Sequence, residues 1–137
     1  MEAVATAQQE SVDRRKVVLL VEDEFRIRWT TSEYLRDAGF RVIEATSAYE
    51  AIEVISCLTR VDIVFCDVNL NGEINGHLLA RWVAKYHPDV AMLLTSGDPS
   101  ASALVATGRT RGFVPKPYLL ADLQLQLEEM LERRYSK

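Results

Sequence analysis

Short apolar runs recur along the chain, and polar or small residues follow each of them. The runs at 17–21, 63–66 and 90–95 are almost wholly apolar, which is typical of strands buried on both faces of a parallel sheet. Two further strands are predicted at 40–45 and 112–115, where apolar residues are fewer or alternate with polar ones. The pattern therefore predicts five strands.

Between the strands, apolar residues recur about every 3.6 residues, which predicts helices. Ser47 and Glu50 have the spacing of a capping box, and Gly39 stands where a glycine often ends a helix. We interpret Glu24 as an acidic residue favoured by the N-terminus of the first helix. The predicted helices span 25–38, 48–57, 78–86, 101–107 and 119–134.

Strand and helix alternate five times along the chain, without an internal repeat or a linker. This order predicts an α/β fold, a doubly wound five-stranded parallel sheet with five helices on its two faces. Right-handed crossovers then place the carboxyl end of every strand at the same edge of the sheet. Open α/β sheets bind their ligands at that edge, so the residues that follow the strands are candidates for a functional site.

The length of 137 residues fits one domain, and 48% hydrophobic with 26% charged residues is ordinary for a globular protein. We expect a flexible polar tail at 1–15, one domain at 16–135 and no output domain. The net charge of −4 and the isoelectric point near 5.2 argue against a nucleic-acid-binding protein.

No apolar run is long enough to cross a bilayer, and the N-terminal segment lacks the basic start and apolar middle of a signal peptide. We therefore expect a cytoplasmic protein without a membrane partner. The two cysteines, Cys57 and Cys66, are too few to suggest a disulfide framework.

Residues with compatible chemistry follow four of the five predicted strands. Three carboxylates brought to one edge would repel one another, so a bound cation is expected among them. Mg²⁺ prefers hard oxygen ligands and usually binds one or two carboxylates together with phosphate oxygens. In strand order, the candidates are Glu22 and Asp23, then Asp67, then Thr95 or Ser96, and finally Lys116.

Asp67 could act as a nucleophile next to such an ion and become an acyl phosphate. Lys116 is a point charge suited to one oxygen of the phosphoryl group. The hydroxyl of Ser96 could donate a hydrogen bond to another. Together these residues predict a site for phosphoryl transfer.

The arrangement resembles the receiver domain of two-component response regulators over about residues 16–134. That family has an acidic pair after the first strand, an acceptor Asp after the third, Ser or Thr after the fourth and Lys-Pro after the fifth. Here the positions are occupied by Glu22-Asp23, Asp67, Ser96 and Lys116-Pro117, and 44 residues (67 − 23) separate Asp23 from Asp67. The resemblance implies a flavodoxin-like sheet with the strand order 2-1-3-4-5.

The resemblance also implies a role for each residue. Asp23 and Asp67 would bind Mg²⁺ directly, Glu22 would act mainly through a water molecule, and Asn69 would contribute its backbone carbonyl. Phe113 stands three residues before the lysine, at the aromatic position that turns inward on activation.

Thr95 and Ser96 both remain candidates for the switch hydroxyl. Ser96 is favoured because Gly97 follows it, and receivers usually have a small residue after this hydroxyl. Asn69 and Asp98 occupy positions that influence the rate of dephosphorylation in the family. The Lys116–Pro117 peptide bond is expected to be cis.

The function that the resemblance implies is a phospho-accepting receiver. It would take a phosphoryl group from a sensor histidine kinase or a histidine phosphotransfer protein onto Asp67. It would then signal to a downstream protein, or form a homodimer, through the face made by the last two helices and the fifth strand. Its own chemistry would be limited to self-catalysed phosphotransfer and autodephosphorylation, so we do not predict an enzyme.

Two alternatives follow from the same residues. A receiver-like module could dock partners without being phosphorylated, although the full set of acidic residues and lysine argues against this. A hydrolase of the haloacid dehalogenase type could form an aspartyl phosphate, but it needs a second Asp two residues after the nucleophile. Asn69 stands there and cannot supply a proton in that way.

Overall fold

The structure, a computed structural model, describes residues 13–57, 60–104 and 110–134. Its centre is one parallel sheet with the strand order β2-β1-β3-β4-β5, which confirms the predicted topology. Every pair of neighbouring strands is parallel and in register over four or five residues. The strands are β1 (Val17–Val21), β2 (Arg41–Ala45), β3 (Ile63–Asp67), β4 (Ala91–Ser96) and β5 (Arg111–Pro115).

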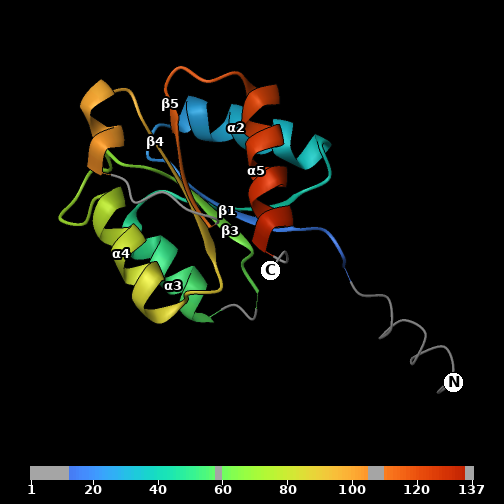
Figure 1. The fold of residues 1–137 in the computed structure, drawn as a ribbon, viewed down its shortest axis with the longest axis horizontal. Helices are drawn as coiled ribbons and strands as arrows, with labels where there is room; N and C mark the ends of the chain where they lie inside the picture. The colour runs from blue at the N-terminus through green and yellow to red at the C-terminus, as the bar shows by residue number, and fades with distance from the viewer. Residues whose placement is uncertain (1–12, 58–59, 105–109, 135–137) are drawn as a thin grey trace, which may run out of the picture.

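Helices cover both faces of the sheet, as Figure 1 shows. In this view α2 and α5 lie on one side of the strands, and α3 and α4 lie on the other. None of the helices in the described part of the chain is long and apolar enough to cross a membrane. The α-helices are α2 (Phe25–Asp37), α3 (Ala48–Cys57), α4 (Gly76–Tyr86) and α5 (Leu120–Arg134).

The prediction of five α-helices was wrong for the described residues, which contain four. In place of the helix predicted at 101–107, the structure has a 3₁₀ helix, η1 (Pro99–Leu104), and residues 105–107 lie outside the described part. Asp98 Oδ1 accepts hydrogen bonds from the backbone N–H and the hydroxyl of Ser100. Such local bonds compete with an α-helix, and no strong apolar period opposes them here.

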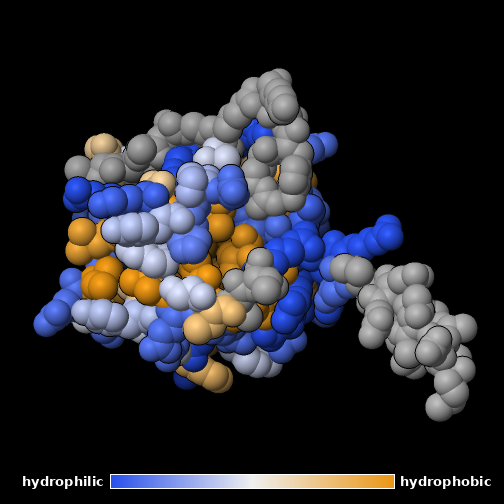
Figure 2. Space-filling view, turned by 90° about the horizontal axis from the view of Figure 1, so that it is seen from below, coloured by the Kyte–Doolittle hydropathy of each residue, from blue (hydrophilic) through white to orange (hydrophobic). Residues whose placement is uncertain are grey.

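Alternate residues of the strands build two separate cores. Val18, Phe65 and their neighbours face α2 and α5, where Leu123 and Leu127 of α5 are fully buried against them. The other residues of the same strands form the second core, with α3 and α4. Figure 2 views the molecule from below and shows hydrophobic side chains at the centre and toward the left edge of this face, among hydrophilic ones.

The first turns of α2 and α3 are capped by side chains. Glu24 is the N-cap of α2, and its carboxylate accepts a hydrogen bond from the Ile27 N–H at 2.9 Å. At α3, the Ser47 hydroxyl accepts from the Glu50 N–H at 3.1 Å, as a capping box requires. The Glu50 carboxylate, however, accepts from the backbone and hydroxyl of Thr46 instead of closing the box on Ser47.

The bonds to Thr46 hold the pKa of Glu50 below its usual value. Because the pKa of Glu50 is lower in the folded than in the unfolded state, its ionised carboxylate stabilises the fold at pH values above the unfolded-state pKa. This stabilisation is lost as the pH falls through the pKa of the folded state. We therefore expect Glu50→Gln to reduce the loss of stability on acidification below about pH 4.3. Urea unfolding at a series of pH values measures this, with the exposed Glu53→Gln as a matched control on the same helix. Parallel pH profiles for Glu50→Gln and wild type would contradict it.

Candidate functional site

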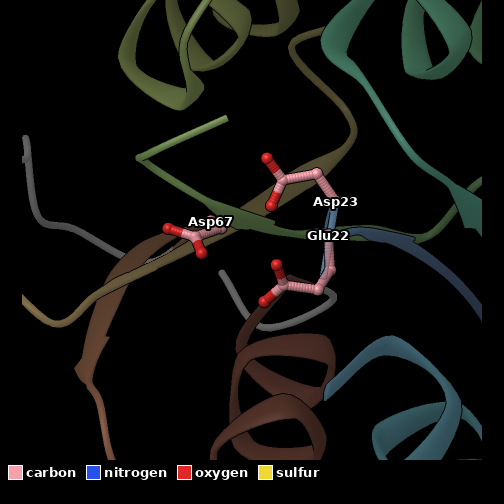
Figure 3. Close-up of side chains that lie close together, drawn as sticks. All are labelled: Glu22, Asp23 and Asp67. Carbon is pink, nitrogen blue, oxygen red and sulfur yellow. The ribbon is translucent and has the colours of Figure 1, made fainter. Parts of the chain in front are cut away.

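Three carboxylates meet at the carboxyl edge of the sheet, as predicted. Glu22 and Asp23 directly follow β1, and Asp67 is the last residue of β3. Each offers an oxygen, and these oxygens all lie within 4.8 Å of one another. Figure 3 shows the three side chains directed into a common space. Neighbouring parallel strands β1 and β3 bring them together, since both strands end at this edge.

Lys116 completes the site from the end of β5. Its Nζ donates to Asp67 Oδ2 at 2.5 Å and to Glu22 Oε1 at 2.9 Å. The side chains of Glu22 and Asp67 are 3% and 7% exposed, and that of Lys116 is 20% exposed. A cation held this close to two buried carboxylates compensates part of their mutual repulsion. The peptide bond between Lys116 and Pro117 is cis, as expected.

Burial and charge act in opposite directions in this cluster. Burial raises the pKa of Glu22, although its hydrogen bond to Lys116 acts to lower it. Burial also acts to lower the pKa of Lys116, but the bonds to Asp67 and Glu22 outweigh it and the net shift is upward. Lys116 therefore stays charged, whereas burial makes the ionised form of Glu22 less favourable in free energy. A further cation would lower that cost.

The loop after Asp67 is tied to the site by its backbone. The Asn69 N–H donates to Asp67 Oδ1 at 2.9 Å, and the Asn71 N–H donates to Asp23 Oδ2 at 3.0 Å. The loop ends at Asn75, whose side chain caps α4. Each of the two aspartates therefore has one carboxylate oxygen oriented by this loop. Sequence reasoning did not identify Asn71, because a backbone donor has no residue-type signal.

Gly76 lies under Asp67, and this close approach is a second feature that sequence reasoning missed. A Cβ at this position would stand 2.6 Å from the carbonyl oxygen of Asp67 and 2.7 Å from Cα of Val68. Both are backbone atoms, so no side chain can turn away to make room. The Gly76 N–H also donates to the Val68 carbonyl at 2.9 Å, which fixes the start of α4 against the end of β3.

We expect Gly76→Ala to destabilise the protein by about 3 kcal/mol, because the added methyl group must push α4 away from β3. Urea unfolding monitored by circular dichroism measures the change. Gly97→Ala is the matched control, since nothing lies within 4 Å of a Cβ built there. Equal stability of the two alanine variants would show that the close approach at Gly76 is relieved without cost.

The two hydroxyl candidates at the end of β4 have different surroundings. Ser96 Oγ accepts a hydrogen bond from the side-chain amide of Asn69 and another from the Asp98 N–H, both at 3.0 Å. Thr95 is 2% exposed, and its hydroxyl has no hydrogen-bond partner in the described part of the chain. The Lys116 N–H also donates to the Ser96 carbonyl, at 2.9 Å. Ser96 is thus the hydroxyl connected to the residues around Asp67.

Phe113 lies on β5, in register with Leu94 of β4. Its ring is partly buried against the core on the side of α3 and α4. Its backbone carbonyl accepts a hydrogen bond from Gln126 of α5 at 3.3 Å. Phe113 therefore links the sheet to α5. In the described residues it forms no hydrogen bond with the three carboxylates.

The donor set fits Mg²⁺. Three carboxylates, two of them buried, bring oxygens within 4.8 Å of one another, and these oxygens are the hard ligands that Mg²⁺ prefers. Three carboxylates against one lysine leave the cluster with more negative charge than Lys116 alone neutralises. Burial in addition raises the pKa of Glu22, so its ionised form gains from a further cation. Asp23, which is partly exposed, leaves this space open to water and to a substrate.

Comparison with known proteins agrees with this geometry. A model of the response regulator receiver domain family matches residues 18–128. The sensor kinase CckA of Brucella abortus is 40% identical over 121 residues, which are 85% of this chain and 13% of that protein. The aerobic respiration control protein ArcA of Escherichia coli is 29% identical over 117 residues, 85% of this chain and 48% of that protein. The chain thus spans about half, or less, of the length of these relatives.

Solved structures show the same fold. The signal receiver domain of an HD domain-containing protein from Pseudomonas fluorescens superimposes with a TM-score of 0.80 at 25% identity. The match covers 90% of this chain and 100% of that domain. A response regulator receiver protein from Sinorhizobium medicae also gives a TM-score of 0.80, at 23% identity, over 88% of this chain and 98% of that one. The chain belongs to the response regulator receiver domain family.

Proposed function

We propose that this receiver domain accepts a phosphoryl group onto Asp67 with Mg²⁺ bound. The observation that carries the proposal is the contact of Lys116 with both Asp67 and Glu22, beside a third carboxylate. A nucleophilic carboxylate alone would repel a phosphate dianion. The lysine supplies one positive charge, and Mg²⁺ held by Asp23, Asp67, the Asn69 carbonyl and, through water, Glu22 would supply the rest.

In the proposed transfer, one carboxylate oxygen of Asp67 attacks the phosphorus of a phosphohistidine. The bond from phosphorus to the imidazole nitrogen breaks, and its electron pair stays with the imidazole, which takes up a proton. Lys116 then holds an oxygen of the phosphoryl group instead of Asp67 Oδ2. The carboxylates of Asp23 and Asp67 would hold Mg²⁺ beside the other phosphoryl oxygens, where it would supply positive charge.

The phosphodonor that fits this chemistry is a sensor histidine kinase or a histidine phosphotransfer protein. One relative, CckA of Brucella abortus, is itself named a sensor kinase, and the matched segment is 13% of it. A receiver that shares this similarity can therefore occur within a longer signalling protein. The absence of an acid at Asn69 argues against repeated turnover of external phosphate esters.

The proposed output is a change in the face formed by η1, β5 and α5. Ser96 would turn toward the new phosphoryl group, and Phe113 would move inward behind it. Ser96 and Phe113 lie on neighbouring strands, and Phe113 is bonded through its carbonyl to Gln126 of α5. Leu125 of α5 is 58% exposed, which leaves an apolar side chain for a downstream protein or a second copy of the chain.

The chemical identity of the product tests the proposal. After incubation with Mg²⁺ and phosphoramidate, the bound phosphate should be released by neutral hydroxylamine, because that nucleophile cleaves acyl phosphates. A phosphate ester on Ser96 or Thr95 would survive the treatment. Bound phosphate that resists hydroxylamine would therefore contradict an aspartyl phosphate.

A further inference from the structure

The hydroxyl of Ser96 is held by two donors in the structure described above. The Asn69 side-chain amide and the Asp98 backbone N–H both donate to Oγ, each at 3.0 Å. Ser96 is 1% exposed, so water does not compete freely for this oxygen. A serine hydroxyl has two acceptor positions and one hydrogen to donate. Both acceptor positions are therefore filled.

Asn69 connects this hydroxyl to the acceptor carboxylate. Its backbone N–H donates to Asp67 Oδ1 at 2.9 Å, while its side chain reaches Ser96 on the neighbouring strand. To donate to a phosphoryl oxygen on Asp67, Ser96 must rotate about its Cα–Cβ bond. This rotation moves Oγ, and hydrogen bonds weaken steeply when their geometry is lost.

We propose that the Asn69 side chain is a latch that holds Ser96 in its resting orientation and so opposes the phosphorylated conformation. The proposal rests on the proposed function of Asp67 but adds a regulatory contact to it. Breaking one hydrogen bond is part of the free energy needed to reach the switched state. The contact between Asn69 and Ser96 therefore lowers the population of the switched state that a phosphoryl group on Asp67 can produce.

Removing the latch should make the switched state easier to reach. Beryllium fluoride with Mg²⁺ is a suitable probe, because it mimics a phosphoryl group on a carboxylate without a covalent step. We expect Asn69→Ala to bind it about three- to tenfold more tightly than wild type, the range given by one net hydrogen bond. Glu73→Gln is the matched control in the same loop, because Glu73 is exposed and does not contact Ser96 or the carboxylates in any hydrogen bond of the described residues.

A double-mutant cycle separates the latch from any direct effect of Asn69 on the probe. In a Ser96→Ala background no hydroxyl remains to be held. The double variant Ser96→Ala/Asn69→Ala should therefore bind beryllium fluoride with an affinity within about 1.5-fold of that of Ser96→Ala alone. An equal gain in both backgrounds, or no gain in the wild-type background, would overturn the latch.

A measurement without the probe distinguishes failure of the latch from failure of the proposed function. Asp98 donates its N–H to the same Oγ, so freeing Ser96 should speed hydrogen exchange of that amide about three- to tenfold in Asn69→Ala. Unchanged exchange would overturn the latch even if beryllium fluoride failed to bind. Conversely, no binding of the probe to wild type, together with the faster exchange, would contradict only the proposed function.

Discussion

Replacing Lys116 with methionine is expected to lower the free energy of unfolding by about 3 kcal/mol in the absence of Mg²⁺. The substitution keeps most of the side-chain volume but removes the cation that lies between Glu22 and Asp67. Two buried carboxylates then face each other without a counter-charge. Protonation of Glu22, whose pKa burial already raises, relieves only part of this repulsion.

Saturating Mg²⁺ should reduce this difference in the free energy of unfolding between Lys116→Met and wild type. Without the competing positive charge of Lys116, the variant should bind Mg²⁺ more tightly and gain more stability from it than wild type does. Urea unfolding in EDTA and in saturating Mg²⁺ measures both effects. Lys85→Met is the control, since Lys85 contacts only the exposed ring of Tyr86 among the charged and aromatic pairs described. Equal stabilisation of Lys116→Met and wild type by Mg²⁺ would place the metal away from this lysine.

Asp67→Asn is expected to weaken Mg²⁺ binding by at least about tenfold. The amide has nearly the volume of the carboxylate, so α4, the loop and Gly76 can keep their positions. One of the three carboxylate charges is lost, and because Lys116 compensates Glu22, only the charge of Asp23 remains uncompensated to attract the ion. The fold should therefore survive while the metal site does not.

Isothermal titration calorimetry with Mg²⁺ measures this loss directly. Asp89→Asn provides a matched control, because Asp89 is exposed and lies just before β4, away from the site. An unchanged dissociation constant in Asp67→Asn would contradict the assignment of Asp67 as a metal ligand. A similar loss in Asp89→Asn would indicate a general effect of net charge.

The sheet could be predicted because its three central strands, β1, β3 and β4, are buried on both faces. Runs such as 17–21 and 63–66 have no polar residues before the carboxylate that follows, and the structure buries them fully. Once five strands and their crossovers are assigned, the position of Glu22, Asp23 and Asp67 at one edge follows from topology alone. The receiver domain family model matches residues 18–128, which contain all five strands.

The segment between β4 and β5 could not be predicted in the same way. Its residues are mostly small or hydroxylic, so neither a helical period nor a strong propensity separates an α-helix from a 3₁₀ turn. Local hydrogen bonds that Ser100 donates to the Asp98 carboxylate decide the outcome in the described part. Sequence spacing carries no information about such bonds.

The side-chain contacts within the site could not be predicted from the sequence either. Nothing in the chain indicates that Lys116 reaches Glu22 as well as Asp67, or that the Asn69 amide reaches Ser96. These contacts depend on side-chain lengths and on the register of β3 with β4. The close approach of Gly76 to the Asp67 carbonyl has the same origin, since it depends on where the loop returns to the strand.

The intact mass of the protein after treatment with phosphoramidate and Mg²⁺ tests the central claim most directly. Wild type and Asp89→Asn are each expected to gain the mass of one phosphoryl group, and Asp67→Asn is expected to gain none. The gain should disappear when EDTA replaces Mg²⁺. No gain in wild type, or the same gain in Asp67→Asn, would contradict the claim that Asp67 is the phosphoryl acceptor.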